Sequence, residues 1–241
     1  MSNLQKKFAK EVFIKGELKH KKVTEKDFIA EPRESGYRGI HLVYQYRGKK
    51  AYNGLLIEIQ IRSKLQHLWA TAVETAGFFT KQAIKSSEAD KEWLDFFKLV
   101  SSAFSIIEDC PLVPNTPTTE KELFLEIKSK EEKLKIVKIM EAWRRAAKTI
   151  SEVDKTKKKF HYYLLELNIN KEELSIFAFT KNQGEIAMKK YSEMEKKNQG
   201  KEYDIVLVGA DTQKDLEKAY PNYFIDTKDF LEKLKEIIGK Y

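Results

Sequence analysis

The stretch LLIEIQIRS, at residues 55–63, alternates apolar and polar side chains with a period of two. This period is typical of a β-strand with one face toward the core and the other available as a working surface. The polar positions are Glu58, Gln60 and Arg62. The apolar positions are Ile57, Ile59 and Ile61. The chain is therefore expected to build a sheet whose accessible face carries a carboxylate, an amide and a guanidinium in line.

The alternating stretch belongs to a predicted hairpin. β-branched and aromatic residues run through 38–46 and 55–62, and the segment RGKKAYNG between them contains glycines and an Asn-Gly pair typical of turns. The second strand continues directly into a predicted helix at 63–80, for which Ser63 can serve as the cap. The apolar side of this helix is expected to comprise Leu65, Leu68, Trp69, Ala72, Val73 and Ala76.

Helices are also predicted at 4–20 and 88–108, and the proline-containing segment at 109–119 is the best candidate for a linker. One long helix should follow the linker and end near residue 158, because apolar residues recur there every three or four positions. They are Ile136, Met140, Trp143, Ala147 and Ile150.

The last part of the chain predicts a small ββαβα module. Its successive elements are expected at 160–169, 173–180, 182–198, 203–209 and 226–238. We interpret Asp204, Asp211 and Asp226 as strand-end, turn and helix-cap residues rather than as a metal cluster. This leaves the module a regulatory or association role.

Composition narrows the class of protein. The chain has 241 residues, of which 41% are hydrophobic, which is enough to build a core. Its single cysteine, Cys110, excludes an internal disulfide, and the sequence has no long apolar run, so we expect a cytoplasmic protein without a membrane role. The net charge of +8 favours an anionic partner, although a lysine-rich surface often has none.

The polar face of the 55–62 strand suits a phosphorylated ligand. Glu58 can hold Mg²⁺ or accept a proton, and the Arg62 guanidinium can fork onto phosphate oxygens. The alternative is a solvated strand face on which acidic and basic residues pair with each other. Alternation alone favours this second interpretation.

Two neighbouring features bear on the choice. His67, Thr71 and Glu74 are spaced to form a polar stripe on the helix that follows the strand. Before the first strand, Gly36 predicts a sharp turn that leaves the ring of Tyr37 exposed for stacking on a base. Taken singly, each of these residues is more often a surface or packing residue than a functional one.

Together the motifs resemble a known family. The segments KDFIAEPRESGYRGIHL and IEIQIRSKLQHLWA resemble the synthetase core of RelA/SpoT-type alarmone synthetases, over roughly residues 20–80. These enzymes are GTP diphosphokinases, also called GTP pyrophosphokinases, that transfer pyrophosphate from ATP to the 3′-hydroxyl of GDP or GTP. The resemblance therefore implies guanosine tetraphosphate metabolism, the stringent response and Mg²⁺ as cofactor.

The resemblance also implies roles for individual residues. Tyr37 would stack on guanine, and Glu58 would bind Mg²⁺ or activate the acceptor hydroxyl. Arg33 would meet the phosphates of the acceptor nucleotide. The remaining nucleotide-binding positions would be Gln60, Arg62, His67 and Glu74.

The family's preceding section, with basic residues for ATP and an aspartate-bearing strand, has no counterpart here. We therefore expect guanine-nucleotide binding with impaired catalysis, from a truncated or derived protein. One alternative is a toxin-like pyrophosphotransferase acting on tRNA, and another is a non-catalytic regulatory or association protein, which could form homo-oligomers. An assay with ATP and each acceptor would separate them.

The expected fold class is α+β, with a truncated nucleotidyltransferase-like mixed sheet, flanking helices, a long helical connector and the C-terminal module. Residues 1–110 would form a partial RelA/SpoT-like nucleotidyltransferase domain. Residues 111–159 would be a linker and long helix, and residues 160–241 a small α/β accessory domain.

Overall fold

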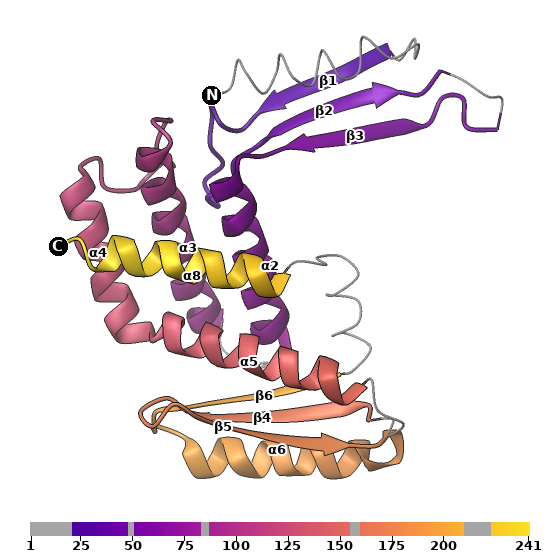
Figure 1. Cartoon of the computed structure of the whole chain (residues 1–241), viewed down its shortest axis with the longest axis vertical. Coiled ribbons are helices and arrows are strands. Elements are labelled where there is room, and N and C mark those ends of the chain that lie inside the picture. Colours follow the sequence, from indigo (N-terminus) through magenta and orange to yellow (C-terminus); the bar gives the residue numbers. More distant parts are fainter. Residues whose placement is uncertain (1–20, 48–50, 83–86, 155–159, 210–222) are drawn as a thin grey trace. The chain divides into compact units, whose positions relative to one another are not determined.

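A computed structural model of the chain describes residues 21–47, 51–82, 87–154, 160–209 and 223–241 (Figure 1). The chain divides into two compact units. The first unit comprises Met1–Trp69, Leu94–Ile127 and Tyr241, and the second comprises Ala70–Trp93 and Lys128–Lys240. The helix predicted at 4–20 lies outside the described residues.

The first unit contains a three-stranded sheet in the order β1-β2-β3 (Figure 1). Its strands are β1 (Lys21–Asp27), β2 (Ile40–Gln45) and β3 (Leu56–Ile61). The β2–β3 hairpin confirms the prediction. Both pairings are antiparallel, so the expectation of a mixed sheet is wrong for the described strands. Strand β1 was not predicted, because KKVTEKD lacks regular apolar alternation and is held by backbone pairing to β2.

The pairing gives the hairpin two chemically different faces. Ile40, Leu42 and Ile29 are buried, with Ile59 and Ile61 packed against them. On the opposite face His41 pairs with Gln60, and Val43 pairs with Glu58. The predicted alternation in β3 is therefore correct at its C-terminal end. At its other end Leu56 and Ile57 are exposed.

Helix α2 (Lys64–Gln82) follows β3, and helix α3 (Ser87–Ile107) comes next in the chain. Trp69 Nε1 on α2 donates to the Phe97 carbonyl oxygen on α3 at 2.7 Å. Within residues 64–77 of α2, the buried residues are Gln66, Leu68, Trp69, Ala70, Thr71, Ala72, Thr75 and Ala76. The predicted polar stripe is interrupted at Thr71, which is buried, because the buried face of α2 is wider than its apolar pattern and also includes threonines.

The helix predicted from the apolar spacing between Ile136 and Ile150 is confirmed, but it does not extend back to the linker. The structure has α4 (Glu120–Leu134) and α5 (Ile136–Asp154). Lys135 between them has φ 54°, a left-handed conformation that ends α4, and the Glu131 Oε1 atom accepts from the Val137 N–H at the start of α5. The apolar residues behind the prediction all lie after this break, so their spacing could not reveal it.

We expect Lys135→Gly to raise the free energy of unfolding by about 1 kcal/mol, because glycine adopts positive φ without the steric cost that a Cβ atom adds. Lys130→Gly, within α4, is the matched control and should lower it by about 1 kcal/mol. Urea titration followed by circular dichroism measures both. Equal losses of stability in the two variants would contradict the assignment of strain to Lys135.

The second unit confirms the predicted ββαβα order. It contains β4 (Tyr162–Asn168), β5 (Glu173–Phe179), α6 (Gly184–Asn198), β6 (Tyr203–Gly209) and α8 (Tyr223–Ile238), with a short 3-10 helix at Lys181–Gln183. The strands form an antiparallel sheet in the order β5-β4-β6. Helix α6 covers one face of this sheet and α5 lies on the other (Figure 1).

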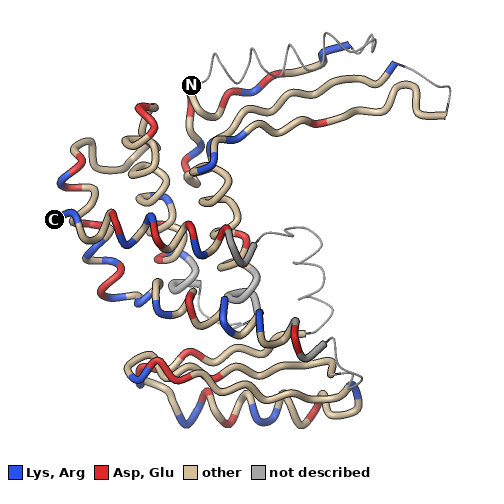
Figure 2. The backbone as a smooth tube through the Cα atoms, viewed as in Figure 1, with Lys and Arg blue, Asp and Glu red and all other residues tan. Residues whose placement is uncertain are grey.

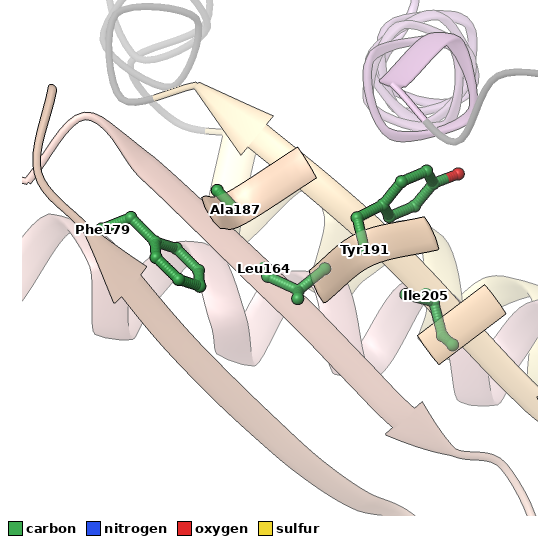
Figure 3. Packing of buried hydrophobic residues seen from close by; sticks show 5 residues of the cluster. All are labelled: Leu164, Phe179, Ala187, Tyr191 and Ile205. Carbon is green, nitrogen blue, oxygen red and sulfur yellow. The ribbon is translucent and has the colours of Figure 1, made fainter. Parts of the chain in front are cut away.

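The layer between α6 and this sheet is apolar. Figure 3 shows its buried members, Leu164, Phe179, Ala187, Tyr191 and Ile205. Along α6 itself acidic and basic residues are interspersed, so the positive charge of the chain is not gathered on this helix (Figure 2). Among the described helices, none combines the length and apolar content needed to cross a bilayer.

Candidate functional site

Five polar side chains of the first unit join in a closed circuit of hydrogen bonds, which we call the polar ring. Its members are Tyr37, His41, Glu58, Gln60 and Arg62. The Tyr37 hydroxyl lies 2.5 Å from His41 Nε2, and His41 Nδ1 lies 2.8 Å from Glu58 Oε1. Gln60 Nε2 donates to Glu58 Oε2 at 2.9 Å, and the Arg62 guanidinium donates to Gln60 Oε1 at 2.7 Å. Arg62 also donates to the Tyr37 hydroxyl, at 3.1 and 3.3 Å, which closes the circuit.

Strand pairing brings the ring together. His41 on β2 stands opposite Gln60 on β3, and Glu58, two residues before Gln60, lies on the same face opposite Val43. Arg62 directly follows β3 and continues the alternation. Tyr37 approaches from the turn before β2, which is closed by a bond from the Arg33 N–H to the Tyr37 carbonyl at 3.2 Å.

Two glycines allow this approach. Gly36 has φ +92°, and a Cβ atom there would lie 2.9 Å from Trp69 Cζ2, so both its conformation and its contact with α2 require glycine. A Cβ atom on Gly39 would lie 3.2 Å from the Tyr37 hydroxyl. The first glycine therefore sets the turn, and the second leaves room for the tyrosine to reach His41 and Arg62.

One assignment of donors and acceptors satisfies every bond of the ring. Arg62 can only donate, so the Tyr37 oxygen accepts from it and directs its own proton to His41 Nε2. In this assignment His41 donates from Nδ1 to Glu58. The bonds from Gln60 and His41 lower the pKa of Glu58 below its usual value, so this carboxylate is ionised at neutral pH.

Aromatic and cationic groups border the ring. The Phe28 ring lies edge to face with Tyr37, at 5.8 Å between centroids, and with His41, at 5.3 Å. The Arg33 guanidinium lies 4.1 Å from the centroid of Phe28, and the Arg62 guanidinium lies 5.2 Å from that of Tyr37. The site thus combines flat apolar surface with two positive groups that can meet an anion.

The structure brings together four of the predicted site residues in the ring and places Arg33 beside it. Tyr37 is half-buried, so its predicted exposure is wrong: its hydroxyl and ring edge already have partners. His67 lies on the first turn of α2 outside the ring, and Glu74 lies further along that helix within the second unit. The binding roles of these residues stay predictions.

His41 and Phe28 belong to the site but were not predicted from the sequence. His41 lies four positions after Tyr37, on the first strand of the predicted hairpin. A register computed from the hairpin turn would have placed it opposite Gln60. Phe28 gave no comparable signal, because its contact with Tyr37 depends on β1, which was not predicted.

One ring member has the chemistry of a cation ligand. The Glu58 side chain is 47% exposed, and each carboxylate oxygen accepts one ring hydrogen bond, so each keeps a lone pair for a further partner. Across the described parts of the chain, no three His, Cys, Asp or Glu side chains converge into a group able to hold a metal ion. Glu58 is thus suited to an ion that draws its other ligands from water or phosphate oxygens.

The segment that carries the polar ring matches known proteins. Residues 3–82 match the model of a family described as a region found in RelA / SpoT proteins. A segment of 51 residues is 45% identical to the GTP pyrophosphokinase YjbM of Bacillus subtilis (strain 168), and covers 20% of this chain and 24% of that protein. This chain therefore carries a RelA/SpoT-type region, and the polar ring lies within it. The match spans about a quarter of the length of the curated relative.

Proposed function

We propose that the polar ring is the acceptor-nucleotide site of a (p)ppGpp synthetase-like protein with a nucleotidyltransferase-like fold. Its substrates would be GDP or GTP as acceptor and ATP as donor of pyrophosphate. The observation that carries the proposal is the ring itself, which joins Glu58, Tyr37 and Arg62 within the segment that matches RelA/SpoT proteins. The name of the matched relative, a GTP pyrophosphokinase, supports the same substrate class.

Tyr37 would supply a platform for guanine. Its contacts with Phe28 and His41 fix the plane of the ring before a ligand arrives, which lowers the entropy lost on stacking. Arg33 and Arg62 lie near enough to this ring for their guanidinium groups to meet the nucleotide phosphates. Stacking and charge pairing would then act on the two ends of one ligand.

His41 and Glu58 together would accept the proton that the 3′-hydroxyl of the acceptor nucleotide releases. In the reaction, the 3′-oxygen bonds to the β-phosphorus of ATP, the bond from that phosphorus to the α-phosphate oxygen breaks, AMP leaves, and the hydroxyl proton must be accepted. The 3′-hydroxyl would take the place of the Tyr37 hydroxyl at His41 Nε2 and give its proton to that nitrogen, and Glu58 on Nδ1 would stabilise the resulting imidazolium. The lowered pKa of Glu58 makes it a weaker base and a better cation ligand.

Mg²⁺ would be held at Glu58 together with nucleotide phosphates, and would offset the charge that develops during transfer. Glu58 is the one carboxylate in the polar ring. An ion with a single protein carboxylate draws its other ligands from water and phosphate oxygens, so the protein itself does little to fix its position. We therefore expect guanine-nucleotide binding with slow pyrophosphate transfer.

Tyr37→Ala is expected to weaken GDP binding by about 1 to 3 kcal/mol, because it removes the stacking surface. Tyr37→Phe keeps that surface and removes only the hydroxyl, so it should retain most of the affinity. Isothermal titration calorimetry with GDP measures both, and ADP tests base selectivity. An affinity unchanged in Tyr37→Ala would eliminate the stacking role, and equal binding of ADP and GDP would eliminate guanine selectivity.

Transfer is tested directly by incubating the chain with γ-labelled ATP and, separately, GDP, GTP or tRNA. Label on GDP or GTP supports the proposal. Label on tRNA alone would replace it with a tRNA-modifying function. GDP binding without any labelled product would indicate a nucleotide-binding regulator. The absence of both GDP binding and labelled product would overturn the proposal.

A further inference from the structure

A buried ion pair adjoins the polar ring in the first unit. Arg38, the residue after Tyr37, donates from its guanidinium to Glu108 Oε2 at 2.8 Å. The two side chains are 1% and 6% exposed. Burying such a pair costs free energy unless good geometry and further hydrogen bonds compensate. The other hydrogen-bond partners of Arg38 and Glu108 therefore show what the pair is attached to.

Glu108 also accepts hydrogen bonds from residues that follow Arg62, the ring member on β3's C-terminal side. Its Oε1 atom accepts from the Ser63 hydroxyl, and its Oε2 atom accepts from Gln66 Nε2 at 3.3 Å. Ser63 is the residue after Arg62, and its Oγ atom caps α2 by accepting from the Gln66 N–H at 3.2 Å. One carboxylate is therefore bonded to the neighbours of two ring members, Tyr37 and Arg62.

Ser101 on α3 completes the attachment of the Tyr37 segment. Its hydroxyl donates to the Gly36 carbonyl at 2.6 Å and accepts from Arg38 Nε at 3.2 Å. The residues on both sides of Tyr37 are thus bonded to this one buried serine. Gly36 is already restricted by its positive φ and by Trp69, so the backbone at Tyr37 has little freedom.

We propose that Ser101 and Glu108 are positioning residues of the acceptor site, which hold Tyr37 and Arg62 at the separation that closes the polar ring. The inference rests on the proposed function of that ring. Neither residue is hydrogen-bonded to a ring member: Ser101 acts through Gly36 and Arg38, and Glu108 acts through Arg38 and Ser63. Side chains that bind a ligand keep their geometry only where a supporting layer fixes the backbone beneath them. Ser101 supplies that layer from within α3, and Glu108 supplies it from the residue after α3.

Two adjacent serines provide a matched test. Ser101→Ala removes the bonds to Gly36 and Arg38. Ser102→Ala, at the next position of α3, also removes a buried hydroxyl, but one bonded to Thr116 and to the Val113 N–H. Ser101→Ala should raise the Kd for GDP about fivefold, which corresponds to about 1 kcal/mol of lost positioning, and Ser102→Ala should raise it less than about twofold. Glu108→Gln should raise it about tenfold or more, because Arg38 loses its charge partner.

A readout without ligand accompanies the titration. The protein is labelled with ¹³C-tyrosine and observed by NMR, and the signal that disappears in Tyr37→Phe is assigned to Tyr37. This signal should shift in Ser101→Ala and stay in place in Ser102→Ala. If wild type fails to bind GDP but Tyr37 shifts in Ser101→Ala alone, the proposed function fails and the positioning role stands. An unmoved Tyr37 signal in Ser101→Ala, or equal losses of GDP affinity in both serine variants, would overturn the inference. These outcomes do not depend on whether Glu108→Gln folds.

Discussion

Glu58→Gln is expected to lower the rate of pyrophosphate transfer from ATP to GDP about 100-fold or more. The amide cannot carry the negative charge that, in the proposed mechanism, would stabilise a protonated His41 and hold the cation on the nucleotide phosphates. Single-turnover assays with the protein in excess over γ-labelled ATP measure the rate. GDP affinity measured without Mg²⁺ should change little, whereas the strengthening of GDP binding by Mg²⁺ should disappear.

Glu25→Gln is the matched control for this variant. Glu25 lies on β1 and pairs in register with Leu42, on the face opposite Glu58. It has the same charge and sits in the same sheet, so a general effect of surface charge would appear in both variants. A Glu58→Gln protein with wild-type transfer and an intact Mg²⁺ effect on GDP binding would contradict the roles given to Glu58.

Asp204→Asn is expected to stabilise the protein at neutral pH by up to about 3 kcal/mol. Burial raises the pKa of Asp204 to about 6, partly offset by the hydrogen bond from Trp143 Nε1 at 2.9 Å. The folded protein therefore keeps a proton on Asp204 at pH values where the unfolded chain, with a pKa near 3.8, has lost it. Stability should fall as pH rises from about 4 to about 6 and stay low above that.

The asparagine variant should lose this part of the pH dependence, because its amide oxygen can still accept from Trp143 and carries no charge. Urea unfolding at pH 4, 5, 6 and 7 measures the slope in both proteins. Glu202→Gln, at an exposed position just before β6, removes one carboxylate without burial and should leave the slope unchanged. A wild-type slope that persists in Asp204→Asn would show that another group titrates.

The hairpin was predictable because its signals are local. Alternation in LLIEIQIRS and the turn residues before it fix the strands and their faces within a short stretch of sequence. The same local signals placed Glu58, Gln60 and Arg62 in line. Strand β1 could not be predicted in this way, since its polar sequence carries no apolar period and its strand conformation comes from pairing with β2.

The rest of the site depends on contacts between distant segments. Ser101 and Glu108 lie far along the chain from Tyr37. No spacing in the sequence predicts the ion pair between Arg38 and Glu108. Thr71 reads as a polar surface position but is buried, because burial of α2 depends on which elements surround it. Lys135 separates α4 from α5 by a left-handed backbone conformation that no glycine or proline marks in the sequence.

The closed polar ring also bears on selectivity. Each member already has hydrogen-bond partners within the protein, so an incoming molecule gains only the difference between new bonds and those it displaces. A ligand with groups in matching positions exchanges bonds nearly one for one, whereas a poorly matched ligand leaves donors and acceptors of the ring unpaired. Such a site discriminates mainly by penalising the wrong molecule, and modest affinity for the right one accompanies strong rejection of near analogues.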